Sequence, residues 1–506
     1  MWNNGCKSYY AAYNENLVSI PANKFHSNFK SLLDFIIMEH TKLVEMRIIM
    51  ENENSDSNIL ETMPVGPLFI KMAVPAVLSQ LINILYNLVD KMFIGHMKTG
   101  GAEALAGLGV TTPVILFLSA FAALVSMGGA PKAAIALGKN EKDIAERIMG
   151  SCMALLLVIS ALLTAGMLIW GKGILLVFGA SEDTIGYAVD YMRIYCLGTV
   201  FIQLSLGLNT FITTQGFAKI SMINVAIGAV INVILDPIMI YGCNLGIKGA
   251  AIATVIAQAV SCVFIVRFLV SEKSSIKLKK SYIQIDWKLL LPCILLGTSP
   301  ALMQITENMV AISFNTILQR YGGDMAVASM SILNSVMQFV MLLLPGLVQG
   351  AQPILSYNLG AGLIQRVRKT FQYLLLSCVA GSCIIWGACM FFPEKIIGIF
   401  TNKTSLIEYS VTPLRTYLCL LCIYGIQVAC QYSFVALDQA KTAIFLTIWR
   451  KIILLIPMIF LLPHIVPDPT IGVFLAEPIA DFVAVCTTGT LFYRYYQMKL
   501  INKSKL

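Results

Sequence analysis

The sequence predicts an all-α polytopic membrane protein with twelve transmembrane helices in two six-helix lobes, related by a pseudo-twofold axis along the membrane normal. Of its 506 residues 57% are hydrophobic and 12% charged, about half the charged fraction of a soluble domain. Apolar stretches of about 20 residues, the length that crosses the hydrocarbon layer, recur along the chain. An internal repeat is the third observation. This composition excludes a soluble enzyme of this length.

Twelve apolar segments bounded by Gly, Pro or charge are the expected spans. The first six are residues 68–94, 105–128, 149–170, 190–215, 220–241 and 247–270. The second six are residues 288–318, 326–350, 371–392, 413–438, 443–463 and 471–495. We therefore expect an N-lobe at 61–270, a basic linker at 271–287, a C-lobe at 288–495 and a tail at 496–506.

Residues 1–60 form a polar N-terminal extension without a span. Residues 29–46 have the composition of an amphipathic helix at the membrane interface. The alternative, which we favour, is that translation starts naturally at Met46 or Met50. On that interpretation residues 1–49 precede the natural start and are poorly ordered.

Lys and Arg are concentrated in the linker, the tail and the connections after even-numbered spans, which places these segments and both termini in the cytoplasm. The net charge of +9 is therefore explained by topology, and we expect the lipid bilayer rather than nucleic acid as its partner. The expected location is the cell (inner) membrane.

The two halves repeat each other at a constant offset of 222 residues. The first-half members are Gly100, Gly101, Ala104, Ala106, Val114, Gly128, Pro131, Leu137 and Gly138. They match Gly322, Gly323, Ala326, Ala328, Val336, Gly350, Pro353, Leu359 and Gly360. Because six spans separate the copies, both halves have the same orientation, an arrangement common in secondary transporters.

Carboxylates at hydrocarbon depth cost about 2.5–3.5 kcal/mol, so they are paired, solvated or functional. In the N-lobe, Asp90 on span one and Asp236 on span five lie at similar depth, with Asn232 one turn before Asp236 and Thr254 on span six. Two carboxylates in one low-dielectric cavity cannot easily both ionise, so a proton or Na+ is expected to bind there. The alternative is that these polar groups are interhelical hydrogen-bonding partners.

A polar cavity that admits substrate is expected between the lobes. Its predicted lining is Gln80, Asn83, Gln304, Glu307, Gln338, Tyr424, Gln427 and Gln431. Structural hydrogen bonding is an equal alternative for each Gln or Tyr, whereas Glu307 needs a partner or a cationic substrate. No Lys or Arg is expected deep in a span, because Lys71, Arg450 and Lys451 are assigned to span ends.

Two segments carry a resemblance to a known family: PAVLSQLINILYNLVDKMFIGHMKTGGAEALAGLGV from Pro75 and INVILDPIMIYGCNLGIKGAAIATVIAQ from Ile231. They resemble the multidrug and toxic compound extrusion (MATE) family, in particular its bacterial MepA-like branch, over about residues 60–495. The resemblance implies export driven by inward flow of Na+ or H+. It assigns Asp90, Asn232, Asp236 and Thr254 to the cation site, with Asn209 of span four supporting them. Asn87 lies one turn before Asp90 on the same face of span one, so we expect it to support the site as well.

Some members of that family hold a cation in the second lobe with a Glu on helix seven and an Asp on helix ten. Glu307 matches the Glu, but Gln427 or Gln431 stands near the position of the Asp, which favours coupling in the first lobe.

We therefore expect a monomeric antiporter of amphipathic cationic drugs or metabolites that works by alternating access. The four histidines are not within spans and the cysteines show no metal-ligand spacing, so neither an enzyme nor a cofactor is expected. The main alternative is a lipid-linked oligosaccharide flippase, which requires a basic cavity. A receptor or channel is a further alternative that the repeat of six spans disfavours.

Overall fold

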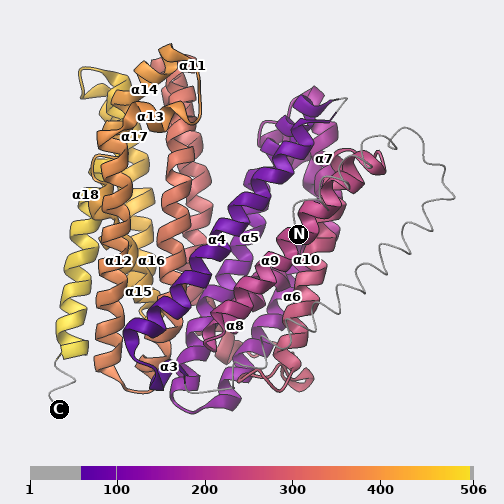
Figure 1. Cartoon of the computed structure of the whole chain (residues 1–506), viewed down its shortest axis with the longest axis vertical. Helices are drawn as coiled ribbons and strands as arrows, with labels where there is room; N and C mark the ends of the chain where they lie inside the picture. Colours follow the sequence, from indigo (N-terminus) through magenta and orange to yellow (C-terminus); the bar gives the residue numbers. More distant parts are fainter. Residues whose placement is uncertain (1–58, 98–99, 502–506) are drawn as a thin grey trace, which may run out of the picture. The chain divides into compact units, whose positions relative to one another are not determined.

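The computed structural model describes residues 59–97 and 100–501, and the expectations for residues 1–49 lie outside this range. The described part of the N-lobe consists of α3 (Ile59–Thr62), α4 (Val65–Gly95), α5 (Gly101–Gly138), α6 (Lys142–Val177), α7 (Glu182–Leu197), α8 (Thr199–Thr214), α9 (Ala218–Pro237), η2 (Ile238–Gly242) and α10 (Ile247–Val270). Figure 1 shows these helices in indigo to pink.

The linker contains the short helix η3 (Lys280–Tyr282). The C-lobe then consists of α11 (Trp287–Gly360), α12 (Ile364–Phe391), α13 (Pro393–Gly398), α14 (Thr404–Tyr417), α15 (Leu421–Ala436), α16 (Ala440–Ile448), η4 (Trp449–Leu455), α17 (Ile456–Leu461), η5 (Leu462–His464), α18 (Pro469–Tyr495) and η6 (Tyr496–Ile501).

The described helices account for twelve spans. Nine are long and apolar enough to cross a membrane, and two further spans are the bent pairs α7–α8 and α14–α15, with bends of 60° and 47°. One of the nine, α11, has 74 residues and would be about 111 Å long if straight, several times the hydrocarbon thickness. It contains a break at Gly323, where φ is 60°, so α11 supplies two spans.

The lobes meet through glycines of the 222-residue repeat. A Cβ built on Gly128 of α5 would lie 1.9 Å from the carbonyl oxygen of Cys293 in α11, and one on Gly350 would lie 2.4 Å from Cα of Ala73 in α4. The second repeated pair behaves alike: a Cβ on Gly138 would meet the Tyr357 oxygen at 2.0 Å, and one on Gly360 the Ile135 oxygen at 2.1 Å. Backbones touch at these points only because the side chains are absent.

These contacts are pseudo-symmetric. Span two of the N-lobe contacts span seven, the first span of the C-lobe, and span eight of the C-lobe contacts span one of the N-lobe in the same way. All lie in the half of each lobe that is nearer the linker, which we call the linker end. In Figure 1 the helices of the two lobes come together at this end, near α3, and lie further apart towards α7 and α14. Helix α4 runs obliquely from the base of the C-lobe into the N-lobe.

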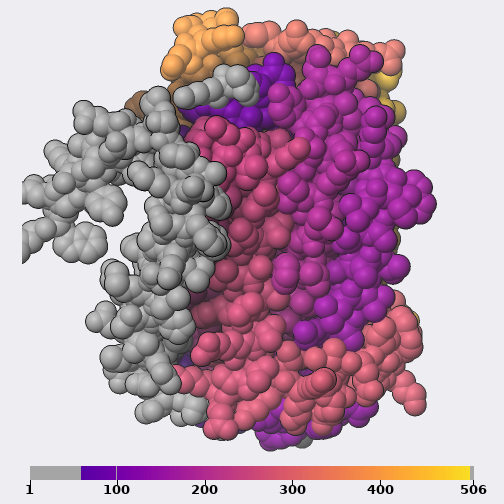
Figure 2. Space-filling model, turned by 90° about the vertical axis from the view of Figure 1, so that its right-hand side faces the viewer, coloured from indigo at the N-terminus to yellow at the C-terminus, as the bar shows by residue number. Residues whose placement is uncertain are grey.

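The linker is docked on the N-lobe rather than free. The Lys279 ammonium lies 2.5 Å from the Glu146 carboxylate of α6, and the Lys277 amide donates to the same carboxylate over 3.1 Å. The Tyr282 hydroxyl donates to Asp143, also on α6. In Figure 2, pink to salmon atoms of this part of the chain cover the lower end of the N-lobe face.

Candidate functional site

Two buried carboxylates meet in the N-lobe. Asp90 lies near the end of α4 and Asp236 at the end of α9, with exposed fractions of 8% and 0%. Their carboxyl groups are close enough to interact electrostatically. Among the ion pairs of the described chain, none joins either of them to Lys or Arg. Two acidic groups therefore share a buried position without a basic partner.

Asn232 and Thr254 complete this cluster as the sequence predicted. The Asn232 amide donates to Asp236 Oδ1 over 3.2 Å and to Thr254 Oγ1 over 3.4 Å, which joins α9 to α10. The spacing of four residues between Asn232 and Asp236 places both on one helix face. We call Asp90, Asn232, Asp236 and Thr254 the N-lobe acid site.

Three oxygens of the N-lobe acid site are buried without a hydrogen-bond partner: Asp90 Oδ1, Asn232 Oδ1 and Asp236 Oδ2. Unpaired buried oxygens are costly, and a proton or a small cation satisfies them. The described residues contain no group of three His, Cys, Asp or Glu arranged for a metal ion. A sodium ion here would therefore need the amide and hydroxyl oxygens in addition to the two carboxylates.

Next to the acid site lie a distorted helix end, at Pro237 and η2, and a hydrogen bond that joins α9 to α4. Asp236 is followed by Pro237 and the π-helix η2, a local distortion often found at functional positions. Just beyond, the Tyr241 hydroxyl donates to the Phe93 carbonyl of α4 over 2.5 Å, so the ends of α4 and α9 are tied together. Tyr191 of α7 is buried beside Thr254, a neighbour that the sequence analysis missed.

The two supporting asparagines are not part of this site. Asn209 donates to Ser221 and accepts from Asn224, and Asn224 is twelve residues, or about 18 Å, from Asp236 along α9. Asn87 is exposed and donates to the Asn83 carbonyl of its own helix. Sequence spacing placed both residues on helices that border the site. Asn209, however, lies too far along its helix to reach Asp236, and Asn87 is exposed whereas Asp90 is buried.

The C-lobe contradicts the expectation that Lys and Arg avoid the span interiors. Arg450 and Lys451 lie in η4, in the middle of span eleven, and are 3% and 4% exposed. Arg450 pairs with Glu477 at 2.9 Å and with Asp481 at 2.7 Å, both on α18. Lys451 pairs with Glu307 at 2.9 Å. We call these five residues the C-lobe charge network.

Glu307 therefore has a basic partner, and the spans of the C-lobe hold three acids rather than one, of which Glu477 and Asp481 are buried and Glu307 is 48% exposed. A signal was present: Arg450 and Lys451 fall eight and nine residues into the expected span 443–463, and Glu477 and Asp481 are spaced by four within 471–495. Because Arg450 and Lys451 were assigned to the end of a span, where water can solvate them, no acidic partners were predicted for them.

The remaining cavity residues divide between the lobe interior and the interface. Tyr424, Gln427 and Gln431 are buried inside the C-lobe, not in a cavity between the lobes. Gln427 donates to Gln431, which donates to Thr447 of α16 over 2.8 Å. Gln80 donates to Gln349 of the other lobe over 3.4 Å. Asn83 and Gln304 are half-buried, and Gln338 is exposed.

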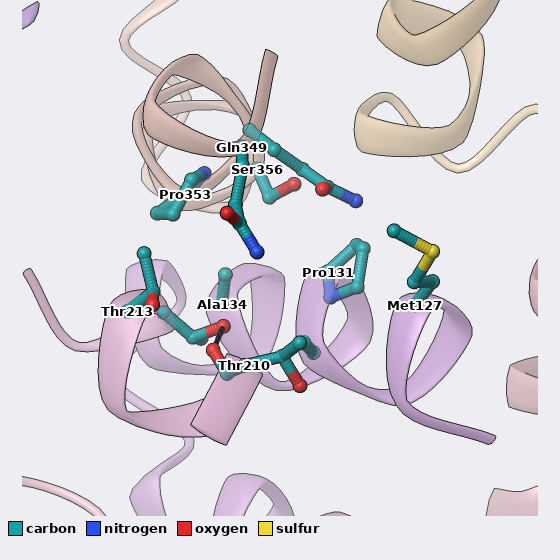
Figure 3. Close-up of a pocket in the computed structure, with 11 residues that line it drawn as sticks. Met127, Pro131, Ala134, Thr210, Thr213, Gln349, Pro353 and Ser356 are labelled. Atoms are coloured by element: carbon teal, nitrogen blue, oxygen red, sulfur yellow. Dashed lines mark hydrogen bonds between the residues drawn. The ribbon is translucent and has the colours of Figure 1, made fainter. Parts of the chain in front are cut away.

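A pocket between the lobes lies at the linker end, and none of the predicted cavity residues lines it. It is lined by Met127, Ala130, Pro131, Ala134, Thr210, Thr213, Thr214, Gln349, Gln352, Pro353 and Ser356. In Figure 3 Gln349, Pro353 and Ser356 face Thr210, Thr213, Pro131 and Ala134 across it. Its volume is about 30 Å³, enough for two or three water molecules at about 10–15 Å³ each. It is a residual gap between closed lobes, too small for a drug-sized molecule.

The sequence profile of the MatE family matches residues 75–238 and 300–461, which include most of both lobes. The chain belongs to the MATE family. As a MATE protein it is a multi-pass membrane protein of a transport family, in agreement with its repeated apolar helices.

Curated relatives and solved structures agree with this assignment. The MATE chain is 24% identical to the multidrug export protein MepA of Staphylococcus saprophyticus, covering 86% of this chain and 95% of MepA. It is 30% identical to the MATE multidrug transporter DinF-BH, whose structure was solved in complex with a small molecule, with a TM-score of 0.80 and coverage of 86% and 97%. A MATE crystal structure in the bent conformation has a TM-score of 0.83, 19% identity and coverage of 89% and 99%.

Proposed function

We propose that this protein is an antiporter that exports amphipathic organic cations in exchange for H+ or Na+ bound at the N-lobe acid site. The observation that carries the proposal is the buried pair Asp90 and Asp236, with unpartnered oxygens and no basic group within the described ion pairs. Two such carboxylates favour binding of a positive ion. The MepA relatives and the DinF-BH complex support small-molecule substrates.

Ion binding can be coupled to export because the site joins three helices that must rearrange. Loading the site neutralises charge between α4 and α9, next to the π-helix η2, and changes the conformational preference of both helices. The lobes then alternate between closure at the linker end, which is the arrangement in Figure 1, and closure at the opposite end. We place the linker end and both termini in the cytoplasm on the basis of the Lys and Arg distribution.

The flippase alternative must be weighed again, because two basic residues do lie deep in the C-lobe. Both are neutralised: Arg450 by Glu477 and Asp481, and Lys451 by Glu307. A pyrophosphate group would have to displace three carboxylates to reach them. The charge network therefore favours the antiporter.

Purified protein in proteoliposomes tests the proposal with a proton gradient and a sodium gradient imposed separately. Wild-type protein is expected to accumulate ethidium, a fluorescent organic cation, under at least one of the two gradients. Asp90→Asn and Asp236→Asn are expected to lose this accumulation, whereas the control Glu103→Gln, an exposed acid on α5, keeps it. Accumulation by Asp236→Asn at the wild-type rate and with the wild-type ion dependence would refute the proposal.

A further inference from the structure

A short helix ahead of span one, α3, is bound to the opposite lobe. The Leu60 carbonyl of α3 accepts hydrogen bonds from the Asn358 amide over 3.1 Å and from the Arg366 guanidinium over 2.9 Å. The same guanidinium nitrogen donates to the Met63 carbonyl over 2.7 Å. The last carbonyls of a helix have no partner within it, and a cationic side chain satisfies them. The segment that leads into the N-lobe is thus anchored on the C-lobe.

The C-lobe holds these donors in a fixed arrangement. Asn358 is fully buried near the end of α11, and its side-chain oxygen accepts a hydrogen bond from Arg366 Nε over 2.9 Å. Its amide also donates to the Ile354 carbonyl of its own helix over 2.8 Å. Beside them, the Tyr357 hydroxyl donates to Glu61 of α3 over 3.2 Å. Asn358 and Arg366 therefore orient each other, and α3 completes their hydrogen bonding.

Another side of α3 contacts the N-lobe. A Cβ built on Gly216, between α8 and α9, would lie 2.9 Å from Cγ2 of Ile59 and 3.6 Å from Cγ of Leu60. Leu60 is 3% exposed and belongs to one apolar cluster with Ala218 of α9 and with residues of α11. Helix α3 is therefore packed between the two lobes at the linker end.

The repeat has a counterpart of α3 ahead of the C-lobe. Val65, the first residue of α4, and Trp287, the first of α11, are related by the 222-residue offset. The linker segment before α11 is held on α6 of the N-lobe, where the Lys277 amide donates to Glu146. Because the linker follows α10 of the N-lobe directly, its docking survives a separation of the lobes. The docking of α3 does not, because α3 leads into the N-lobe and is bonded to the C-lobe.

We propose that α3, residues Ile59–Thr62, is a latch that holds the linker end closed, and that Arg366 is the positioning residue that keeps it in place. Only Met63 and Pro64 separate α3 from α4, so α3 moves with that helix. Separation of the lobes at the linker end then requires Arg366 to release the carbonyls of Leu60 and Met63. The latch rests on the proposed alternation of the lobes, but not on the identity of the ion or the substrate.

Distances between spin labels across the linker end test the latch. The labels are carried by unnatural amino acids at exposed positions 142 on α6 and 441 on α16, in protein reconstituted in nanodiscs without an ion gradient. Arg366→Gln is expected to raise the ratio of long to short distances about tenfold or more, because two carbonyls lose hydrogen bonds from a charged donor. Arg366→Lys retains a cationic donor and should open the linker end less than Arg366→Gln.

Arg368→Gln is the matched control. Arg368 also lies on α12, but it donates to the Tyr496 hydroxyl of its own lobe over 3.2 Å, so the control loses the same charge without altering the bonds to α3. It should retain the wild-type distances. An equal shift in Arg368→Gln would attribute the opening to lost charge at the linker end and would overturn the proposal. An unchanged distribution in folded Arg366→Gln would overturn it as well.

A second variant tests the latch without altering Arg366, and it decides the matter if Arg366→Gln does not fold. Leu60→Ala removes most of the side chain that packs beside Gly216 and should shift the distances in the same direction. Gly138→Ala, whose Cβ would lie 2.0 Å from the Tyr357 carbonyl oxygen, shows whether the labels detect opening. Opening in Gly138→Ala but in neither latch variant would overturn the latch alone. No opening in any variant would overturn both the latch and the alternation of the lobes on which it rests.

Discussion

Buried carboxylates are compensated differently in the two lobes of this MATE protein. In the C-lobe, Arg450 and Lys451 lie beside their acids at 2.7–2.9 Å. In the N-lobe, Asp236 accepts a hydrogen bond from the Asn232 amide, and none of the described ion pairs includes Asp90 or Asp236. A basic side chain beside a buried carboxylate keeps that carboxylate ionised. Where no basic side chain is present, the compensating positive charge must come from a bound proton or metal cation, which can exchange. This contrast is why we place coupling in the N-lobe.

Asn232→Leu is expected to reduce ion-driven transport about tenfold or more. Its amide is the donor to Asp236 Oδ1, and a hydrogen bond to a charged group contributes about 1.5–3 kcal/mol. Asn209→Leu is the matched control, because Asn209 bonds to Ser221, which lies about 22 Å from Asp236 along α9. Transport rate against the concentration of the driving ion measures both. Equal effects of the two substitutions would contradict the assignment of Asn232, but not Asn209, to the N-lobe acid site.

Arg450→Gln is expected to destabilise the protein by about 3–5 kcal/mol, because it leaves Glu477 and Asp481 buried without their cation. Adding Asp481→Asn to it should restore part of that free energy by removing one uncompensated charge. Unfolding in detergent by increasing denaturant measures both variants. A double variant less stable than Arg450→Gln alone would contradict the charge balance described for the C-lobe.

The sequence analysis predicted the N-lobe acid site and missed the C-lobe charge network, although the charged residues of that network fall within expected spans. Asp90, Asn232 and Asp236 lie on long regular helices, so helical spacing and depth were sufficient to bring them together. Arg450 and Lys451 lie in the π-helix η4, between α16 and α17 of one interrupted span. Basic residues beside an apolar run suggested a span end, and only the fold shows their acids on α18.

At the scale of elements, hydropathy predicts the middle of each membrane span correctly but does not predict where the helices end or bend. The expected span 149–170 is the apolar part of α6, which continues at both ends to Lys142 and Val177. The expected span 190–215 is two helices, α7 and α8, bent by 60° at Gly198. Hydropathy reports the hydrocarbon layer, whereas helix ends and bends depend on local backbone bonding and packing.

The linker is an element whose docking the sequence did not predict. Its basic residues were assigned to topology, yet Lys279 pairs with a Glu146 carboxylate that is 2% exposed. The Glu146 carboxylate also accepts from the Lys277 amide, so it holds the linker backbone as well as a side chain. The segment between the lobes is thereby tied to the N-lobe.

Glu146→Gln is expected to make the linker several-fold more sensitive to trypsin, because it weakens the bonds to Lys277 and Lys279. The hydrogen bond with Glu146 raises the pKa of Lys279 above its usual value. A raised lysine pKa means that the pair is present at neutral pH and is lost only when the pH rises through that value, above about 10.4. The difference from wild type should therefore be constant between about pH 7 and 9. A difference that disappears within that range would contradict the pairing.

At the scale of the whole molecule, the repeat seen in the sequence is the contact surface between the lobes. Gly128 and Gly350, and likewise Gly138 and Gly360, touch backbone of the opposite lobe at the linker end. Lys132 of α5 adds an ion pair at 2.7 Å with Asp438, two residues after the end of α15. The sequence predicted the twofold relation from these glycines, but not that they hold the linker end closed.

Gly138→Ala is expected to open the linker end, because its Cβ would lie 2.0 Å from the Tyr357 carbonyl oxygen and 2.8 Å from the Ala361 nitrogen. Gly109→Ala on the same helix is the control, since nothing lies within 4 Å of its Cβ. Spin labels at exposed positions 139 and 365, one in each lobe, report the separation by pulsed electron resonance. We expect longer distances in Gly138→Ala only. An unchanged distance distribution would show that these glycines do not control closure.

The central claim is that Asp236 couples an ion to transport and does not merely support the fold or bind substrate. Exchange of labelled for unlabelled substrate across proteoliposomes without any ion gradient, compared with gradient-driven accumulation, separates these roles for Asp236→Asn. The account predicts that the variant retains exchange and loses accumulation under both proton and sodium gradients. Accumulation at the wild-type level, or loss of exchange in a folded variant, would contradict it.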